Sequence, residues 1–142
     1  MTALLRAIAT GDPSLSYRAF FPLAAYVQTK WYSDAAEDWH DRLLAGFDAD
    51  VVVLHGELGQ HAAAARLVRY SVDDPAAVWV LPGVEDNKSP YWRVYDTTLT
   101  YRIGPGMRTI AVTTMISCAG ASLQNVTIFS VEQTSSASMR TA

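Results

Sequence analysis

The hydrophobic pattern divides the chain into a helical first half and a strand-rich second half. Through residues 2–66 apolar side chains recur at helical spacing, whereas from Leu67 onward β-branched and aromatic residues take over with a period of two. When helices are followed by a run of strands, the helices pack on one face of an antiparallel sheet. The pattern therefore predicts an α+β fold with N-terminal helices.

The helical half contains signals for four helices. Thr2 caps the first and Gly11 ends it. Pro22 opens a second helix that runs to about Tyr32, because a proline in the first helical turn loses no hydrogen bond. A short turn or helical cap over residues 61–65 closes this half of the chain.

The third helix has the clearest pattern. Trp39, Leu43 and Phe47 recur at i, i+4 and i+8, and Asp34 with Glu37 forms a capping-box-like start. This spacing places the three apolar residues on the side of the helix that faces the core.

Residues 51–58 fit two structures. Asp50 can cap a helix that Gly59 ends, but the run of three valines from Val51 also suits a strand. Periodicity does not decide between the two, and we favour the helix.

Turn residues separate five strands in the second half. The expected strands are residues 67–72, 77–81, 91–103, 107–118 and 125–132. A Gly-Pro-Gly turn at residues 104–106 joins the two longest strands into a hairpin. Residues 134–142 are small, polar and aperiodic, which predicts a flexible tail after a single domain of residues 1–133.

Composition restricts the class of protein. Of the 142 residues 50% are hydrophobic and 18% charged, with a net charge of -3, so the chain can bury a sizeable core as one domain. No cluster of lysines and arginines is present to neutralise phosphates, which argues against nucleic acid as a partner. No apolar run approaches the roughly 18 residues that a membrane span needs. Cys118 is the single cysteine, so an intrachain disulfide and a cysteine zinc site are excluded. We therefore expect a cytoplasmic protein with no membrane partner.

The third predicted helix carries a candidate charged site. If its apolar residues face the core, Asp38 and Arg42 lie four residues apart on one flank of the helix. A carboxylate that points into a cavity and is held by an arginine can activate water or abstract a proton. The same spacing also fits a solvated helix surface whose charges pair with one another.

The strand over residues 91–103 has two candidate inward faces. Period two gives one face the residues Tyr91, Arg93, Tyr95, Thr97, Leu99, Tyr101 and Ile103. If this face turns inward, its tyrosines line a pocket, and Arg93 needs an anion that Asp38 or a ligand carboxylate can supply. If the opposite face turns inward, Asp96 is buried as a general base. The tyrosines also fit a sheet edge in contact with water, and periodicity leaves the choice open.

The sequence contains no motif for a metal or a cofactor. His55 and His61 lie six residues apart across two glycines, a spacing that does not bring two ligands together as i, i+4 does on a helix. No Gly-x-Ser-x-Gly motif is present, and the glycines at 104–106 join two strands instead of opening a helix at a phosphate. We expect neither a metal nor a cofactor.

Four segments resemble a known group of proteins. They are residues 20–26 (FFPLAAY), 38–43 (DWHDRL), 99–102 (LTYR) and 110–119 (IAVTTMISCA). These segments resemble small uncharacterised actinobacterial proteins, and the order of helices before a curved sheet is similar to the NTF2-like superfamily, also called SnoaL-like or cystatin-like. In that superfamily a bent antiparallel sheet wraps a helix and leaves a conical apolar cavity. The cavity serves cofactor-free cyclases, isomerases, epoxide hydrolases and dehydratases, and also non-catalytic modules.

The resemblance implies a small-molecule protein. We expect a cofactor-free cyclase or isomerase that acts, as a homodimer, on an apolar, oxygenated, polyketide-like metabolite. The expected catalytic residues are Asp38, Arg93, Tyr95 and Asp96. The expected substrate-binding residues are Tyr26, Trp39, Trp79, Tyr91 and Tyr101. The alternatives are an epoxide hydrolase-type enzyme with an Asp/Arg/Tyr site, and a non-catalytic dimeric module that uses an exposed aromatic sheet face as its interface.

Overall fold

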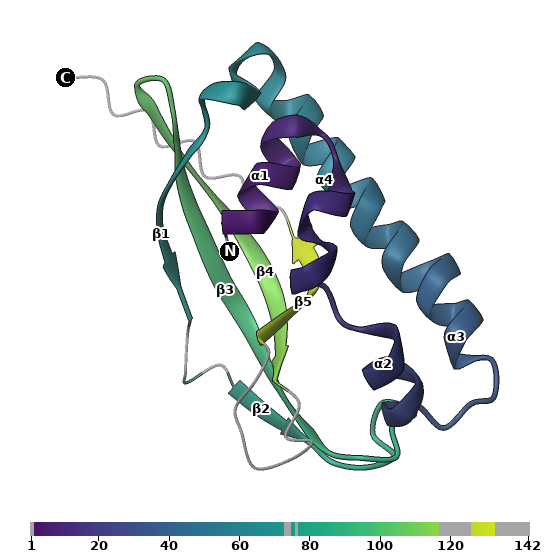
Figure 1. Ribbon diagram of the computed structural model, residues 1–142. Coiled ribbons are helices and arrows are strands. Elements are labelled where there is room, and N and C mark those ends of the chain that lie inside the picture. The colour runs from purple at the N-terminus through teal and green to yellow at the C-terminus, as the bar shows by residue number, and fades with distance from the viewer. Residues whose placement is uncertain (1, 73–74, 76, 117–125, 133–142) are drawn as a thin grey trace.

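Helices cover one face of an antiparallel sheet in the computed structural model (Figure 1). The structure describes residues 2–72, 75, 77–116 and 126–132. Within these ranges it contains four α-helices and five strands in one sheet, so the predicted α+β fold is confirmed. Among the helices of these ranges, none has the length and apolar character needed to cross a bilayer. The predicted tail, residues 134–142, lies outside the described residues.

The N-terminal helices follow the predicted start and stop signals. α1 (Thr2–Thr10) ends where Gly11 adopts a φ of +71°, a left-handed conformation that favours glycine. A 3-10 helix, Pro13–Ala19, is not predicted by the pattern, and Asp12 caps it by accepting a hydrogen bond from a backbone amide in its first turn. α2 (Leu23–Thr29) starts one residue later than predicted, because Pro22 is the extended residue that precedes the helix. It also ends earlier, because Lys30 has an extended backbone.

One long helix replaces the predicted third and fourth helices. α3 (Ala35–Asp38) continues through a π-helical stretch, Trp39–Leu44, into α4 (Ala45–Leu58), and the residues at both junctions keep right-handed helical angles. The predicted boundary at Asp50 is therefore wrong, since buried residues on both sides of it lie on one stripe of the same helix. The helical assignment of residues 51–58 is confirmed. A 3-10 helix, Gly59–Ala64, follows where a short turn is predicted.

The sheet is built around the long strand β3 (Tyr91–Ile103), which has the predicted bounds. Its first half pairs with β2 (Ala77–Val80) and its second half with β1 (Arg66–Ser71), so these two strands follow one another along the same edge. β4 (Gly106–Ile116) returns through the predicted hairpin, and β5 (Val126–Glu132) pairs with β4. All of these pairings are antiparallel.

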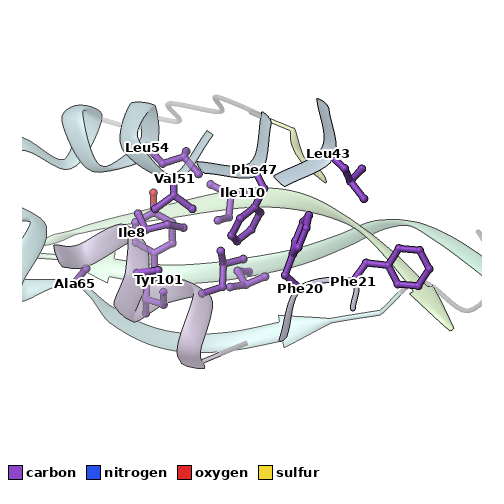
Figure 2. Packing of buried hydrophobic residues seen from close by; sticks show 14 of the residues in the cluster. Ile8, Phe20, Phe21, Leu43, Phe47, Val51, Leu54, Ala65, Tyr101 and Ile110 are labelled. Carbon is purple, nitrogen blue, oxygen red and sulfur yellow. The ribbon is translucent and has the colours of Figure 1, made fainter. Parts of the chain in front are cut away.

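The hydrophobic core lies between the helices and the inner face of the sheet (Figure 2). Phe47, Val51 and Leu54 of α4 are buried on one side of this core. Tyr101 and Ile110 of the hairpin are buried on the other side. The apolar stripe of the long helix therefore shares one core with the inner face of the hairpin.

The face of β3 that contains Tyr91 turns toward the helices. Tyr91 and Tyr101 are buried, whereas Trp92 is 38% exposed. The register of β3 against β4 shifts between Val94 and Thr97, which interrupts the simple alternation of faces. Most of the face with the tyrosines thus turns inward, but Tyr95 of this face is 39% exposed and Val94 of the opposite face is buried.

Candidate functional site

A loop and the end of a helix bring two groups of charged residues together. The connection between β2 and β3 lies beside the C-terminal end of α2 (Figure 1). The Trp31 amide donates to the Asp86 carbonyl at 2.9 Å, and the Lys88 amide donates to the Thr29 carbonyl at 2.6 Å. Lys30, with its extended backbone, forms an isolated β-bridge with the same loop. These backbone bonds hold the loop against the helix layer.

The first group, the Asp38 cluster, consists of Tyr26, Tyr32, Asp38 and Arg42. Arg42 donates from Nε to Oδ1 of Asp38 at 2.7 Å and from Nη2 to Oδ2 at 2.6 Å, a bidentate pairing. The Tyr26 hydroxyl donates to Oδ2 and accepts from Arg42 Nη2 at 2.8 Å. The Tyr32 hydroxyl lies 3.0 Å from Oδ2 and 2.7 Å from the Tyr26 hydroxyl. One carboxylate thus organises an arginine and two tyrosines.

Hydrogen bonding makes Asp38 a weak base. The donors of Arg42 hold the pKa of the Asp38 carboxyl well below its usual range, although partial burial opposes them. Burial and the hydrogen bond to Asp38 raise the pKa of the Tyr26 hydroxyl far above its usual range. At neutral pH Asp38 is therefore ionised and Tyr26 protonated. The carboxylate orients its neighbours as a hydrogen-bond acceptor and has little tendency to take up a proton.

The second group, the Glu85 cluster, has the same chemical composition and consists of Glu85, Tyr91, Arg93 and Tyr95. Arg93 donates from Nη1 to Oε1 of Glu85 at 2.6 Å and from Nη2 to Oε2. The Tyr91 hydroxyl donates to Oε2, and Arg93 Nη1 lies 3.3 Å from the Tyr95 hydroxyl. Burial raises the pKa of Tyr91, which keeps its hydroxyl protonated. The sequence suggests Asp38 or a ligand as the anionic partner of Arg93, and the structure pairs Arg93 with Glu85.

Asn87 fixes the loop that carries Glu85. Its side chain is buried, and Oδ1 accepts from the Glu85 amide at 3.1 Å. Nδ2 donates to the carbonyls of Leu81 at 3.1 Å and Ser89 at 2.8 Å. The backbone carbonyl of Asn87 accepts from the Gly83 amide at 2.8 Å. This set of bonds holds the loop in the conformation that points Glu85 at Arg93.

Lys30 lies between the two clusters. Its Nζ lies 5.7 Å from the centroid of the Tyr26 ring and 5.9 Å from that of Tyr32, both in the Asp38 cluster. The same Nζ donates to the backbone carbonyl of Glu85 in the other cluster. Lys30 is only 9% exposed, and burial lowers the pKa of its ammonium group. Lys30 and the two clusters together form one polar site, the two-cluster site.

The structure brings five of the predicted site residues into the two-cluster site and places Trp39, Trp79 and Tyr101 elsewhere. The five are Tyr26, Asp38, Tyr91, Arg93 and Tyr95.

The other predicted residues have different surroundings. Trp39 donates from Nε1 to a backbone carbonyl at 2.8 Å, which anchors its ring beside the core. Trp79 packs on Trp92 away from the site, with ring centroids 5.0 Å apart. Tyr101 is buried near the C-terminal end of β3. The side chain of Asp96 lies outside the described part of the chain.

The sequence does not predict three residues of the site, Lys30, Tyr32 and Glu85, nor Asn87, which supports the site. The interval between β2 and β3 is rich in polar residues, and an asparagine there is a typical turn residue. That signal could have indicated an ordered loop. The position of Lys30 has no local signal, because the carbonyl that it contacts lies 55 residues away in the sequence.

Two further findings concern metal binding and similarity to known proteins. In the ranges that the structure describes, no three histidine, cysteine or acidic residues gather in a way that could hold a metal ion. No protein-family model, curated protein or solved structure matches this chain. The interpretation of the two-cluster site therefore rests on its own chemistry.

Proposed function

We propose that this protein binds an apolar, oxygenated small molecule at the two-cluster site and rearranges it without a cofactor, as a cyclase or an isomerase. The proposal includes an NTF2-like fold, in which the sheet and the helices enclose a conical apolar cavity next to the site. The layer of helices on one face of an antiparallel sheet supports it. A polyketide-like chain is the substrate class that we propose.

The meeting of four tyrosines with two pairs of carboxylate and arginine is the observation that carries the proposal. A tyrosine offers an apolar ring to the body of a ligand and a hydroxyl to its oxygen atoms. An arginine stabilises negative charge that develops on a substrate oxygen. The hydrogen bonds among Tyr26, Asp38 and Arg42 fix these groups before any ligand binds. Groups fixed in this way can hold a flexible chain in one reactive conformation, which accelerates its closure into a ring.

The low basicity of Asp38 favours rearrangement over hydrolysis. An epoxide hydrolase-type reaction needs a carboxylate that takes a proton from the attacking water. Asp38 already accepts hydrogen bonds from Arg42 and Tyr26, and these bonds stabilise its ionised form. A substrate whose own groups react once they are folded together makes a smaller demand on this carboxylate.

Turnover of linear poly-β-ketones tests the proposal. The protein is incubated with synthetic tetraketide analogues, and cyclised products are quantified by absorbance and mass spectrometry. Asp38→Asn is expected to lower kcat/KM about tenfold or more, because Arg42 and Tyr26 lose the acceptor that orients them. Asp41→Asn, an exposed change in the same helical stretch, should leave turnover unchanged. If the wild-type protein does not accelerate cyclisation of any analogue, the proposed enzyme activity is wrong.

The exposed pair Trp79 and Trp92 supports a second candidate, a non-catalytic dimeric module. Trp79 is 39% exposed and Trp92 38% exposed, and tryptophan is enriched at the centres of protein interfaces. Sedimentation velocity should show a dimer that Trp92→Ser converts to a monomer. Dimerisation of a protein that turns over no analogue would favour this candidate over the enzyme. A wild-type monomer at all concentrations would contradict it.

A further inference from the structure

Lys30 is a buried cation that has no carboxylate partner among the residues that the structure describes. Its ammonium group has three N–H donors. Within the described residues it donates a hydrogen bond to the backbone carbonyl of Glu85, which is neutral. The ion pairs of the same residues join Arg42 to Asp38 and Arg93 to Glu85. A buried charge is costly unless an opposite charge compensates it.

Among the side chains that the structure describes, the charged groups of the two-cluster site leave one positive charge in excess. The carboxylate of Asp38 neutralises Arg42, and that of Glu85 neutralises Arg93, so Lys30 is the cation that remains. The carboxylates of Glu85 and Asp86 also act on Lys30 without a direct ion pair. Glu85 is already paired with Arg93, and Asp86 is exposed, so water screens its charge. The site therefore suits a ligand that brings a single negative charge.

The surroundings of Lys30 also suit an apolar ligand body. The rings of Tyr26 and Tyr32 lie within 6 Å of Nζ, at 5.7 and 5.9 Å, and provide apolar surface beside the charge. Burial leaves little water to solvate the ammonium group, so an anion that reaches it meets little competition from solvent. An amphipathic acid has both of the required parts.

We propose that the ligand of the two-cluster site carries a carboxylate, and that this carboxylate pairs with the ammonium group of Lys30. This inference rests on the proposed function and specifies its substrate class as an apolar, oxygenated carboxylic acid. A carboxylate is a monoanion and matches the single excess charge, whereas a phosphate monoester brings up to two charges at neutral pH. Burial lowers the pKa of Lys30 in the free protein, and a bound carboxylate would raise it again.

Two probes with the same apolar body test the inference. Octanoate and 1-octanol are titrated separately into the wild-type protein at pH 7, and both dissociation constants are measured by calorimetry. A charge-assisted hydrogen bond from Lys30 should make octanoate bind about tenfold more tightly than 1-octanol. The chain contains two lysines, and the exposed Lys88 provides a matched control.

The variants separate the role of the charge from that of the fold. Lys30→Met should abolish the preference for octanoate and leave binding of 1-octanol within about twofold of the wild type, and Lys30→Arg should keep a preference because it keeps a cation. Lys88→Met should bind both probes as the wild type does. If Lys30→Met fails to fold, the wild-type ratio and the Lys30→Arg variant still decide the question.

The two titrations have four possible outcomes, and each one supports or overturns the inference. A preference for octanoate that depends on Lys30 supports the inference. Equal binding of the two probes by the wild-type protein overturns the inference and leaves the proposed function standing, since apolar binding remains. Absence of binding by both probes overturns the inference and counts against the proposed function as well. A preference for octanoate that persists unchanged in Lys30→Met overturns the assignment of the carboxylate to Lys30.

Discussion

Arg93 on β3 and Glu85 in the preceding loop form a bidentate ion pair across the turn that leads into the strand. The side chain of Arg93 is 13% exposed and that of Glu85 27% exposed, so the pair is largely shielded from water. Charges that are shielded in this way depend on each other, because removal of either one takes two charge-assisted hydrogen bonds from the other. The pair therefore ties the loop to the sheet and orients the Tyr91 hydroxyl.

Removing Glu85 should destabilise the protein. Glu85→Ala removes the bidentate ion pair with Arg93, and we expect the free energy of unfolding to fall by about 2 kcal/mol or more. Urea denaturation at pH 7 measures this change. Glu57→Ala, an exposed change on α4, should alter the free energy of unfolding by less than about 0.5 kcal/mol. A Glu85→Ala variant as stable as the Glu57→Ala variant would contradict the structural role of the pair.

Asn87 should matter more for stability than its neighbours in the same loop. Asn87→Ala removes the bonds that this buried side chain makes to the Glu85 amide and to two carbonyls. We expect a loss of about 1–3 kcal/mol in the free energy of unfolding, together with weaker binding of 1-octanol. Ser89→Ala, whose side chain is exposed, serves as the control. Equal stability of the two variants would show that Asn87 does not hold the loop.

The Asp38 cluster should make stability depend on pH in the acid range. The pKa of Asp38 is depressed in the folded protein, so its contribution to stability is complete above the unfolded pKa of about 4 and is lost as the pH falls toward the folded value. The free energy of unfolding of the wild type should therefore decrease more steeply between pH 4 and pH 2 than that of Asp38→Asn. Asp41→Asn should keep the wild-type slope. Parallel curves for the wild type and Asp38→Asn, measured by urea denaturation across this range, would contradict the pairing with Arg42.

Two glycines should respond to alanine with opposite signs. Gly11 has a φ of +71°, and a Cβ there would lie 2.8 Å from Cδ2 of His55, so Gly11→Ala should lower the free energy of unfolding by about 1–3 kcal/mol. Gly46 lies in the long helix, where an added Cβ would meet nothing within 4 Å, and Gly46→Ala should raise the free energy of unfolding by about 0.5–1 kcal/mol. Thermal denaturation of both variants measures the difference. A stabilising Gly11→Ala would show that His55 does not pack against this turn.

Local patterns predict most of the elements of this fold. The period of two gives the bounds of β3, and the turn at residues 104–106 gives the hairpin, because both depend on residues that are close in the sequence. The continuity of the helix through Asp50 cannot be predicted in the same way. An aspartate is compatible with a cap and with a helix interior, and the buried stripe through Phe47 and Val51 decides in favour of the interior.

The site is less predictable, because its contacts join distant segments. Asp38 and Arg42 are neighbours on one helix, and their pairing follows from a spacing of four residues. The contact between Lys30 and the loop before β3 depends on how that loop packs on the end of α2, which no periodicity records. The alternation of faces in β3 is also interrupted where the register shifts after Val94, so a simple period of two could not assign Tyr95.

In our proposal the two clusters and Lys30 form one binding site for an apolar, oxygenated molecule. The most direct measurement is a titration with 1-octanol followed by NMR of protein labelled at the tyrosine Cζ carbons, since the chain contains seven tyrosines and four belong to the site. We predict that the signals of the site tyrosines shift together with one dissociation constant; these are Tyr26, Tyr32, Tyr91 and Tyr95. The signals of Tyr17, Tyr70 and Tyr101 should stay in place. Shifts confined to these three, or no shift in any of the seven, would contradict the claim.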